Sequence, residues 1–179
     1  MSKTWDAIVS GGGAAGLFCA GVAGQLGKRV LVLDHAEVLG EKIRISGGGR
    51  CNFTNLHSSP ANFLSLNQHF VKSALARYPS SEFIKLVSAY GISYHEKHQG
   101  QLFCDDSAKE IIEMLFAECT KGNVSIRHPV SVLSIAQDGD RWAIQTNAGT
   151  EKSKSIVMAT GGLPVPAIGA TAYSLDVAR

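Results

Sequence analysis

Two short apolar runs, with a stretch of small residues between them, open the chain. Residues 6–10 and 30–34 are rich in branched aliphatic side chains and predict buried strands, while residues 14–26 predict a helix that ends at Gly27. Two strands joined by so short a helical crossover are expected to pair in parallel through a right-handed connection. The first 34 residues therefore predict a β-α-β unit of an α/β fold.

The middle of the chain mixes loop, helix and short strand patterns. Residues 37–55 are glycine-rich and predict an irregular loop. Ser107 and Glu110 have the spacing of a capping box, which predicts a helix that runs to Lys121 and ends at Gly122. Between the loop and this helix, the pattern predicts helices over 68–78 and 81–90 and short strands over 92–96 and 101–103.

The last third of the chain has the pattern of a series of short strands. Turn signals at 138–140 and 147–149 separate the runs, and Gly161-Gly162 ends the last of them. The predicted strands are 124–128, 130–137, 141–146, 150–154 and 155–160. This region is thus expected to be a small β-meander that leads into an apolar strand.

Composition narrows the class of protein. With 179 residues, 45% hydrophobic and 18% charged, the chain is expected to fold around a sizeable core. The net charge is +2 and no block of lysine or arginine occurs, which predicts no nucleic-acid partner. The uncharged stretch 7–27 is too rich in glycine for a membrane span, so no membrane partner is predicted.

The cysteines and histidines predict neither a disulfide framework nor a metal site. The four cysteines form no C-x-x-C pair, and a reduced, cytoplasmic setting is the expectation. The six histidines are dispersed, and His95 and His98 are expected on opposite faces of a strand and turn. Cys51 is interpreted as a small structural side chain, because no partner cysteine lies near it in the sequence.

A glycine fingerprint for dinucleotide phosphates lies between the first strand and the first helix. Gly11-x-Gly13-x-x-Gly16 supplies a tight turn, a close approach to a pyrophosphate, and close packing of helix on strand, with Ala14 and Ala15 at the helix N-terminus. Asp34 ends the second strand 18 residues after Gly16, where its carboxylate is expected to accept ribose hydroxyl groups. An acid there argues against the 2′-phosphate of NADP.

The remainder of the chain favours FAD over NAD as the dinucleotide. A simple NAD domain continues with repeated β-α-β units, whereas this chain inserts a long segment, then a meander, then a strand that ends at Ala159-Thr160-Gly161-Gly162. The run Gly47-Gly48-Gly49 would let the backbone pass close to a flat ring and present amide donors to it.

These blocks resemble the BaiN/YhiN-like family of FAD-dependent oxidoreductases, within the glutathione-reductase type of flavoproteins. The resemblance covers essentially the whole chain and is most specific in Gly40-Glu41-Lys42-Ile43-Arg44-Ile45-Ser46-Gly47-Gly48-Gly49-Arg50-Cys51-Asn52-Phe53-Thr54-Asn55. It implies a Rossmann-like parallel sheet of the glutathione-reductase FAD-binding type with a β-meander, incomplete at its C-terminal end. Beyond Gly162 the family pattern is partly lost, since Pro164 replaces a serine and the run from Gly169 to Ser174 has fewer glycines.

The resemblance also implies which residues bind FAD. The glycine loop would contact the pyrophosphate, Asp34 the adenosine ribose, and Val130 the adenine through its backbone amide and carbonyl. Lys42 and the loop 47–52 would run along the flavin, and Thr160 and Gly161 would close over the cofactor. Arg44 and Arg50 could pair with phosphate or be solvated loop charges. The predicted binding residues are Gly11, Gly13, Ala14, Ala15, Gly16, Asp34, Lys42, Gly48, Gly49, Arg50, Cys51, Asn52, Val130, Thr160 and Gly161.

The expected function is that of part of a flavin-dependent oxidoreductase. The parent enzyme would transfer hydride between NAD(P)H and an organic small molecule, and no catalytic acid or base is assigned. Two alternatives stay open: a non-catalytic nucleotide-binding fragment or subunit that needs a partner, and a relative of tRNA-modifying flavoproteins. Because family members are roughly twice as long, we expect a truncated domain, little activity alone, and self-association through an unpaired sheet edge.

The whole chain is expected to be one partial FAD-binding domain in five parts. These parts are a β-α-β unit (1–34), a flavin-side loop (35–60), a helical insertion (61–122), a β-meander with its return strand (123–162) and the start of a truncated continuation (163–179).

Overall fold

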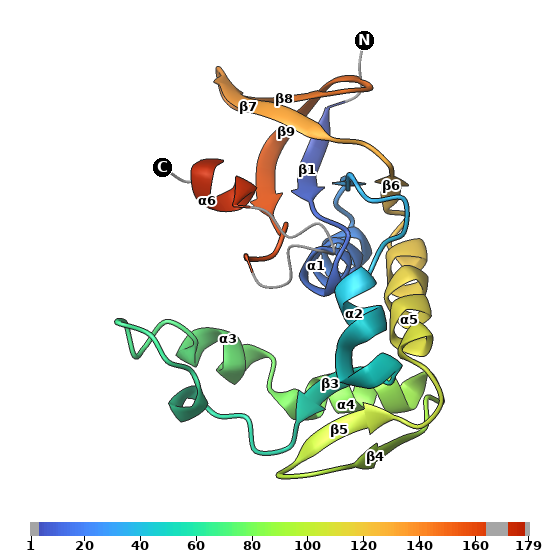
Figure 1. Ribbon diagram of the computed structural model, residues 1–179. Coiled ribbons are helices and arrows are strands. Elements are labelled where there is room, and N and C mark those ends of the chain that lie inside the picture. The colour runs from blue at the N-terminus through green and yellow to red at the C-terminus, as the bar shows by residue number, and fades with distance from the viewer. Residues whose placement is uncertain (1–3, 164–171, 178–179) are drawn as a thin grey trace. The chain divides into compact units, whose positions relative to one another are not determined.

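The computed structural model describes residues 4–163 and 172–177. The chain divides into two compact units, the first made of residues 1–42 and 115–179 and the second of residues 43–114 (Figure 1). Of the residues beyond Gly162 that depart from the family pattern, Pro164 to Thr171 lie outside the described part, and Tyr173–Val177 form the short helix α6.

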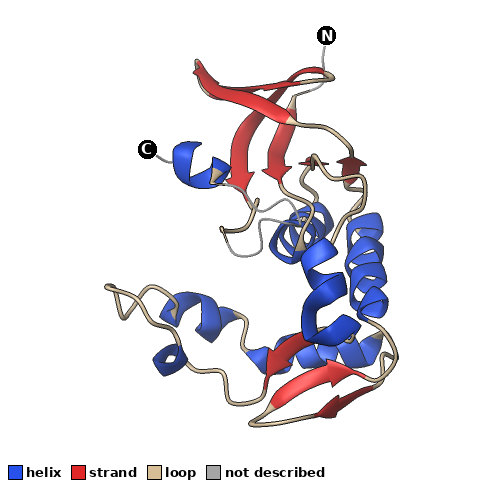
Figure 2. Ribbon diagram, in the orientation of Figure 1, coloured by secondary structure: helices blue, strands red, loops and turns tan. Residues whose placement is uncertain are grey.

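The first unit is built on a six-stranded sheet in the order β6-β2-β1-β9-β8-β7. Strands β1, β2, β6 and β9 run parallel, while β7 and β8 form an antiparallel extension (Figure 2). The strands are β1 (Trp5–Ser10), β2 (Val30–Leu33), β6 (Ser125–Arg127), β7 (Val132–Asp138), β8 (Arg141–Thr146) and β9 (Gly149–Met158). The prediction of an α/β, Rossmann-like, mostly parallel sheet is confirmed.

The core of this sheet follows directly from the apolar runs. Ile8, Leu31 and Leu33 are fully or almost fully buried, and Ile144 of the meander joins them. Trp5 and Trp142 pack against this cluster. The residues of β2 are buried along its whole length because strands lie on both sides of it and helices pack on the sheet.

The predicted break within the last strand is wrong. Residues 150–154 and 155–160 were expected as separate strands, but β9 is one continuous strand of ten residues. From Gly149 to Ser153 it pairs antiparallel with β8, and from Ser153 onwards it pairs parallel with β1. The strand is continuous because β8 pairs with its first half and β1 with its second half, and no local pattern reveals these partners.

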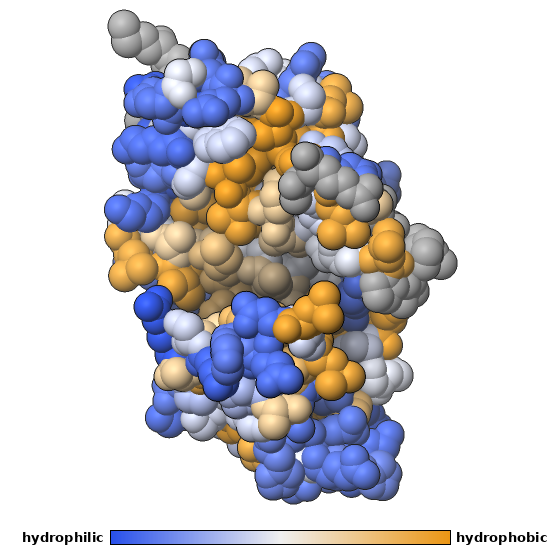
Figure 3. All heavy atoms as spheres, turned by 90° about the vertical axis from the view of Figure 1, so that its left-hand side faces the viewer, coloured by the Kyte–Doolittle hydropathy of each residue, from blue (hydrophilic) through white to orange (hydrophobic). Residues whose placement is uncertain are grey.

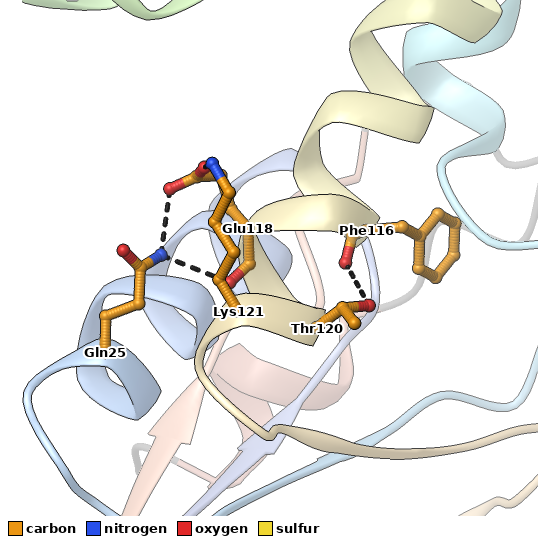
Figure 4. Close-up of polar contacts among 5 residues, drawn as sticks. All are labelled: Gln25, Phe116, Glu118, Thr120 and Lys121. Carbon is orange, nitrogen blue, oxygen red and sulfur yellow. Dashed lines mark hydrogen bonds and ion pairs between the residues drawn. The ribbon is translucent and has the colours of Figure 1, made fainter.

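Helix α1 (Ala14–Gln25) packs closely on the last turns of α5 (Ala108–Lys121) in the first unit. Cys119 Sγ donates to the carbonyl of Leu17 at 3.2 Å, and a Cβ at Gly24 would lie 2.5 Å from the carbonyl oxygen of Gly122. The Gln25 amide donates to the Glu118 carbonyl and carboxylate at 3.1 and 2.8 Å, as Figure 4 shows. Small residues on α1 therefore let the two helices approach closely.

The second unit is organised around a small antiparallel sheet with the order β3-β5-β4. Three of its rings pack together, since Phe53 lies 6.1 Å from Phe83 of α4 and 5.5 Å from Tyr94, measured between ring centroids. Its elements are η1 (Ser46–Gly49), β3 (Asn52–Asn55), η2 (Pro60–Asn62), α3 (Lys72–Arg77), α4 (Ser80–Ala89), β4 (Tyr94–Glu96) and β5 (Gln101–Cys104).

Two local predictions for the middle of the chain are corrected. Residues 37–55 are not one irregular loop, since they contain α2 (Glu41–Ile45), η1 and β3. The helix predicted over 68–78 is only the six residues of α3. Strand β3 forms because β5 pairs with it, and that pairing partner lies nearly fifty residues away in the sequence.

The predicted capping box at the start of α5 forms in part. The Glu110 carboxylate accepts from the Ser107 amide at 3.4 Å, but Ser107 Oγ accepts from the amide of Lys109 at 3.2 Å rather than from that of Glu110. Among the helices of residues 4–163 and 172–177, none is long and apolar enough to cross a membrane.

Candidate cofactor site

The glycine loop joins the carboxyl end of β1 to α1 and is held by backbone hydrogen bonds. The Gly11 amide donates to the carbonyl of Leu33 at 2.8 Å, and the Leu17 amide donates to the carbonyl of Gly13 at 2.9 Å. Gly11 has φ +114°, and a Cβ there would lie 2.4 Å from the Ala159 carbonyl oxygen. A Cβ at Gly16 would lie 1.8 Å from the carbonyl oxygen of Gly11. Gly11 and Gly16 are therefore required by the fold.

Gly13 differs from its two neighbours in the fingerprint. A Cβ at Gly13 would meet no atom within 4 Å, so nothing in the packing of the chain requires a glycine there. Gly13 is the N-cap of α1 and provides no side-chain cap, and no acidic side chain lies in the first turn. The exposed residues Ala14 and Ala15 follow it. A helix start with uncapped amides beside open space is suited to binding an anion.

The Asp34 carboxylate is tied to the glycine loop. Its Oδ2 accepts from the amide of Gly12 at 2.5 Å, and its Oδ1 accepts from the amide of Ala36 at 2.8 Å. The carbonyl of Asp34 accepts from the Val130 amide at 2.7 Å. Asp34 therefore positions the loop, and a contact with ribose stays a prediction. Because the Val130 amide already has a backbone partner, the predicted adenine contact would be left to its carbonyl.

The end of β9 supplies the opposite side of the same loop. The backbone nitrogen of Thr160 lies 2.9 Å from the place of a Gly11 Cβ, so the two segments are in contact. Thr160 Oγ1 is buried and has no hydrogen-bond partner among the described residues. Lys42 Nζ lies 3.7 Å from the place of a Cβ at Gly161. The structure thus brings the glycine loop, Asp34, Thr160, Gly161 and Lys42 together in the first unit.

These features fit a bound dinucleotide. The helix start offers amide donors to a pyrophosphate, and the space at Gly13 allows the close approach that the phosphates need. An orphaned buried hydroxyl, that of Thr160, is the kind of group that a ligand satisfies. Lys42 adds a positive charge beside Gly161.

The other predicted binding residues, from Gly48 to Asn52, belong to the second unit. Gly47, Gly48 and Gly49 all have positive φ, and so does Cys51 at +51°. A Cβ at Gly47 would lie 2.6 Å from the ring of Phe103, whereas a Cβ at Gly48 would meet nothing within 4 Å. The loop thus combines one glycine that the sheet requires with one that faces open space. Its contact with the flavin stays a prediction.

Cys51 has no partner cysteine near it in the sequence, but the fold places Cys104 beside it. The Cys104 amide donates to the carbonyl of Arg50 at 2.9 Å, so the pairing of β3 with β5 brings the two cysteines close together. Burial raises the pKa of the Cys51 thiol. Burial, with the neighbouring Cys51 second, raises the pKa of Cys104 to about 12. Both groups are therefore held as neutral thiols, which supports a structural role.

Cys104 is expected to resist alkylation in the folded chain. A thiol with a pKa of about 12 has a thiolate fraction at pH 8 about a thousandfold below that of free cysteine. Iodoacetamide labelling at pH 8, followed by peptide mass spectrometry, is expected to modify Cys104 only slowly until denaturant is added. Equal labelling rates with and without denaturant would contradict this.

Sequence reasoning also missed a histidine–carboxylate pair in the second unit. His95 Nδ1 lies 2.7 Å from the Asp105 carboxylate, and its ring stacks on Phe103 with centroids 6.3 Å apart. His95 and Phe103 are direct partners across β4 and β5, which a hairpin pattern over 92–103 could have suggested. Within the described residues, no group of three or more metal-ligating side chains is arranged around an ion.

Replacing Asp34 with alanine is expected to weaken FAD binding at least tenfold and to lower the melting temperature by a few degrees. The substitution removes the acceptor of the Gly12 and Ala36 amides as well as the predicted ribose partner. Asp34→Asn keeps one acceptor oxygen, so its FAD affinity and melting temperature should lie between those of the parent chain and Asp34→Ala. Titration with FAD and thermal melts check both values, and an unchanged FAD affinity in Asp34→Ala would contradict the predicted contact with the ribose.

The class of protein follows from this arrangement. A mostly parallel sheet with a glycine loop after β1 and an acid after β2 defines a dinucleotide-binding Rossmann domain. The family model "HI0933-like protein Rossmann domain" matches residues 5–179, and the chain belongs to this family. The resemblance drawn from the sequence and the prediction of FAD as the cofactor are confirmed.

Known relatives agree with this assignment. The chain is 51% identical over 177 residues to a ribosomal RNA dihydrouridine synthase of Escherichia coli, covering 99% of this chain and 44% of that protein. It is 24% identical to a 3-dehydro-bile acid delta(4,6)-reductase of Clostridium scindens, covering 96% of this chain and 42% of the relative. The chain thus spans less than half the length of these curated relatives.

A solved structure shares the fold. The glycine oxidase of Bacillus cereus matches with a TM-score of 0.61 at 14% identity, covering 90% of this chain and 57% of that one. At this level of identity the match concerns the fold alone.

Proposed function

We propose that this chain is the FAD-binding part of a reductase that transfers hydride from NAD(P)H to a carbon–carbon double bond in a ring, with uridine in ribosomal RNA as the acceptor. The observation that carries the proposal is 51% identity, across nearly the whole chain, to a protein named for making dihydrouridine in ribosomal RNA. The more distant relative is also named as a reductase, a 3-dehydro-bile acid delta(4,6)-reductase. This proposal departs from the expectation, drawn from the charge pattern, that the chain has no nucleic-acid partner.

The residues of the first unit would bind and orient the cofactor. Amides at the start of α1 would hold the pyrophosphate, and Asp34 would hold both the loop and the ribose. Thr160 Oγ1, which has no hydrogen-bond partner among the described residues, would gain one. When bound, FAD supplies a group that accepts and passes on a hydride. The four cysteines are all free thiols, which supports a reducing compartment such as the cytoplasm.

The 179-residue chain by itself is expected to hold FAD weakly and to oxidise NAD(P)H slowly. A large cofactor binds tightly where a preformed site buries most of its surface. The relatives have more than half of their length outside the region that this chain matches. Flavin absorbance after purification and NADH consumption with added FAD measure both properties. Stoichiometric FAD with rapid turnover would contradict this and exclude the non-catalytic alternative.

A chimera tests the proposed function directly. This chain would replace the matching part of the Escherichia coli relative, and the hybrid would be expressed in a strain that lacks that relative. Mass spectrometry of digested ribosomal RNA should then detect dihydrouridine, and the same chimera carrying Gly13→Val should not restore it. A chimera that binds FAD and consumes NADH but leaves ribosomal RNA unreduced would overturn the assignment of the substrate.

A further inference from the structure

We propose that residues 56–78 of the second unit form a contact surface for single-stranded RNA, an inference that rests on the RNA substrate of the proposed function. We call these residues the η2–α3 segment. They connect β3 to α4 and include only the short elements η2 and α3 (Figure 1). The surface is defined by three observations: its charge, its exposed rings, and the absence of an extended apolar helix.

Charge is divided unevenly within the second unit. Residues 43–81 contain no aspartate or glutamate, and all of their lysine and arginine side chains are exposed; these are Arg44, Arg50, Lys72 and Arg77. Residues 82–114 contain three lysines against six carboxylates. The near-neutral charge of the whole second unit therefore conceals a positive first half, residues 43–81. Within the η2–α3 segment itself the cations are Lys72 and Arg77 and no aspartate or glutamate occurs, and such a segment attracts a phosphate backbone.

Aromatic rings in this segment are left in contact with water. Phe63 is 42% exposed and Phe70 is 55% exposed, and their rings meet edge to face with centroids 6.5 Å apart. Tyr78 is exposed at the end of α3. Exposed rings in a segment that also carries exposed cations can serve as platforms on which unpaired bases stack, and stacking needs bases that are free of a duplex.

Other occupants fit this surface less well. A membrane surface would favour an amphipathic helix, but α3 has only six residues and the apolar side chains lie mostly before it. An apolar protein partner would pack on Leu64, which is 98% exposed, as well as on the rings. Such a partner would therefore lose affinity when Leu64 is removed, whereas RNA would not. Figure 3, which views the side of the molecule on which α3 lies in Figure 1, shows strongly hydrophilic side chains beside hydrophobic ones over the second unit. This mixture suits a ligand with both charged and flat apolar parts.

The test measures RNA binding by fluorescence anisotropy. The probe is a fluorescein-labelled oligouridylate of about twelve nucleotides, with a duplex of the same length as comparison. The double variant Phe63→Ala/Phe70→Ala is expected to bind the single strand at least about tenfold more weakly, since each stacked base contributes about that much. Phe63→Tyr/Phe70→Tyr keeps both rings and should bind like the parent chain.

Charge variants and matched controls complete the test. Lys72→Gln/Arg77→Gln should weaken binding and reduce the salt slope by about 1.4, the value for two contacts with a single strand. Lys109→Gln removes an exposed lysine of the same unit outside the segment and should change nothing. Leu64→Ala removes an apolar side chain without a flat face and should also leave RNA binding unchanged.

Several outcomes would overturn the RNA surface. One is that the parent chain does not bind the single strand, and another is that it binds the duplex equally well. A third is that the affinity for the single strand is unchanged in Phe63→Ala/Phe70→Ala. Conversion of a dimer to a monomer in Phe63→Ala/Phe70→Ala, without an effect on RNA, would assign the surface to a second copy. Measuring FAD affinity on the same variants separates this test from the test of the proposed function. If the proposed flavin chemistry is wrong, the FAD affinity or the product made by the chimera will show it, and the anisotropy of the RNA probe will not change.

Discussion

Replacing Gly13 with valine is expected to abolish FAD binding while the chain keeps its fold and nearly its melting temperature. A Cβ at this position meets no protein atom within 4 Å, so the chain itself accommodates a side chain there. The same open space is what a pyrophosphate needs in order to reach the amides at the start of α1. The valine would therefore compete only with the ligand.

Calorimetric titration with FAD and with ADP measures the loss of binding, and circular dichroism measures whether the fold and melting temperature are kept. ADP carries the pyrophosphate and ribose without the flavin, so it reports on the first unit alone. Gly139→Ala, a substitution in the turn between β7 and β8, serves as a control with no expected effect on either ligand. If Gly13→Val bound FAD and ADP like the parent chain, the loop would be a structural turn only.

The opposite result is expected for valine at Gly16, which should prevent the first unit from folding. Its Cβ would lie 1.8 Å from the carbonyl oxygen of Gly11 and close to Val9 of β1. Neither atom can move without separating α1 from the sheet. The cost is expected to be several kcal/mol, comparable to the whole stability of a typical domain.

Soluble yield and urea unfolding check this prediction. Ala15→Val is the matched control, because residue 15 is exposed and the same valine costs only about 0.5 kcal/mol of helix propensity there. A Gly16→Val chain whose unfolding midpoint equalled that of the parent would show that the helix and strand do not depend on this close approach.

Local sequence patterns were sufficient for the β-α-β unit and for the positions of the glycine loop and the acid that it carries. The apolar runs at β1 and β2, the fingerprint from Gly11 to Gly16 and the acid at Asp34 all lie within 34 residues. Their roles depend on short-range geometry: a strand end, a tight turn and a helix start. The family could be identified from the sequence for the same reason, because its most specific block is one continuous run.

Pairing between distant segments was beyond those patterns. The continuity of β9, the closeness of Cys51 to Cys104 and the pairing of His95 with Asp105 each depend on strand partners. A short strand has little intrinsic preference for its own conformation, and its neighbours in the sheet decide its length and register.

The charge of the second unit shows the same limit. Counted along the chain, basic and acidic residues nearly cancel, and the sequence predicted no surface for a polyanion. The fold leaves all the cations of residues 43–81 exposed, in a segment that also exposes Phe63 and Phe70. The sequence by itself determined the family, the glycine loop and the FAD cofactor, because these depend on contiguous residues. Only the tertiary structure decided which side chains share a strand pair, which glycine faces open space and which rings stay in water, because each depends on the atoms that distant segments place nearby.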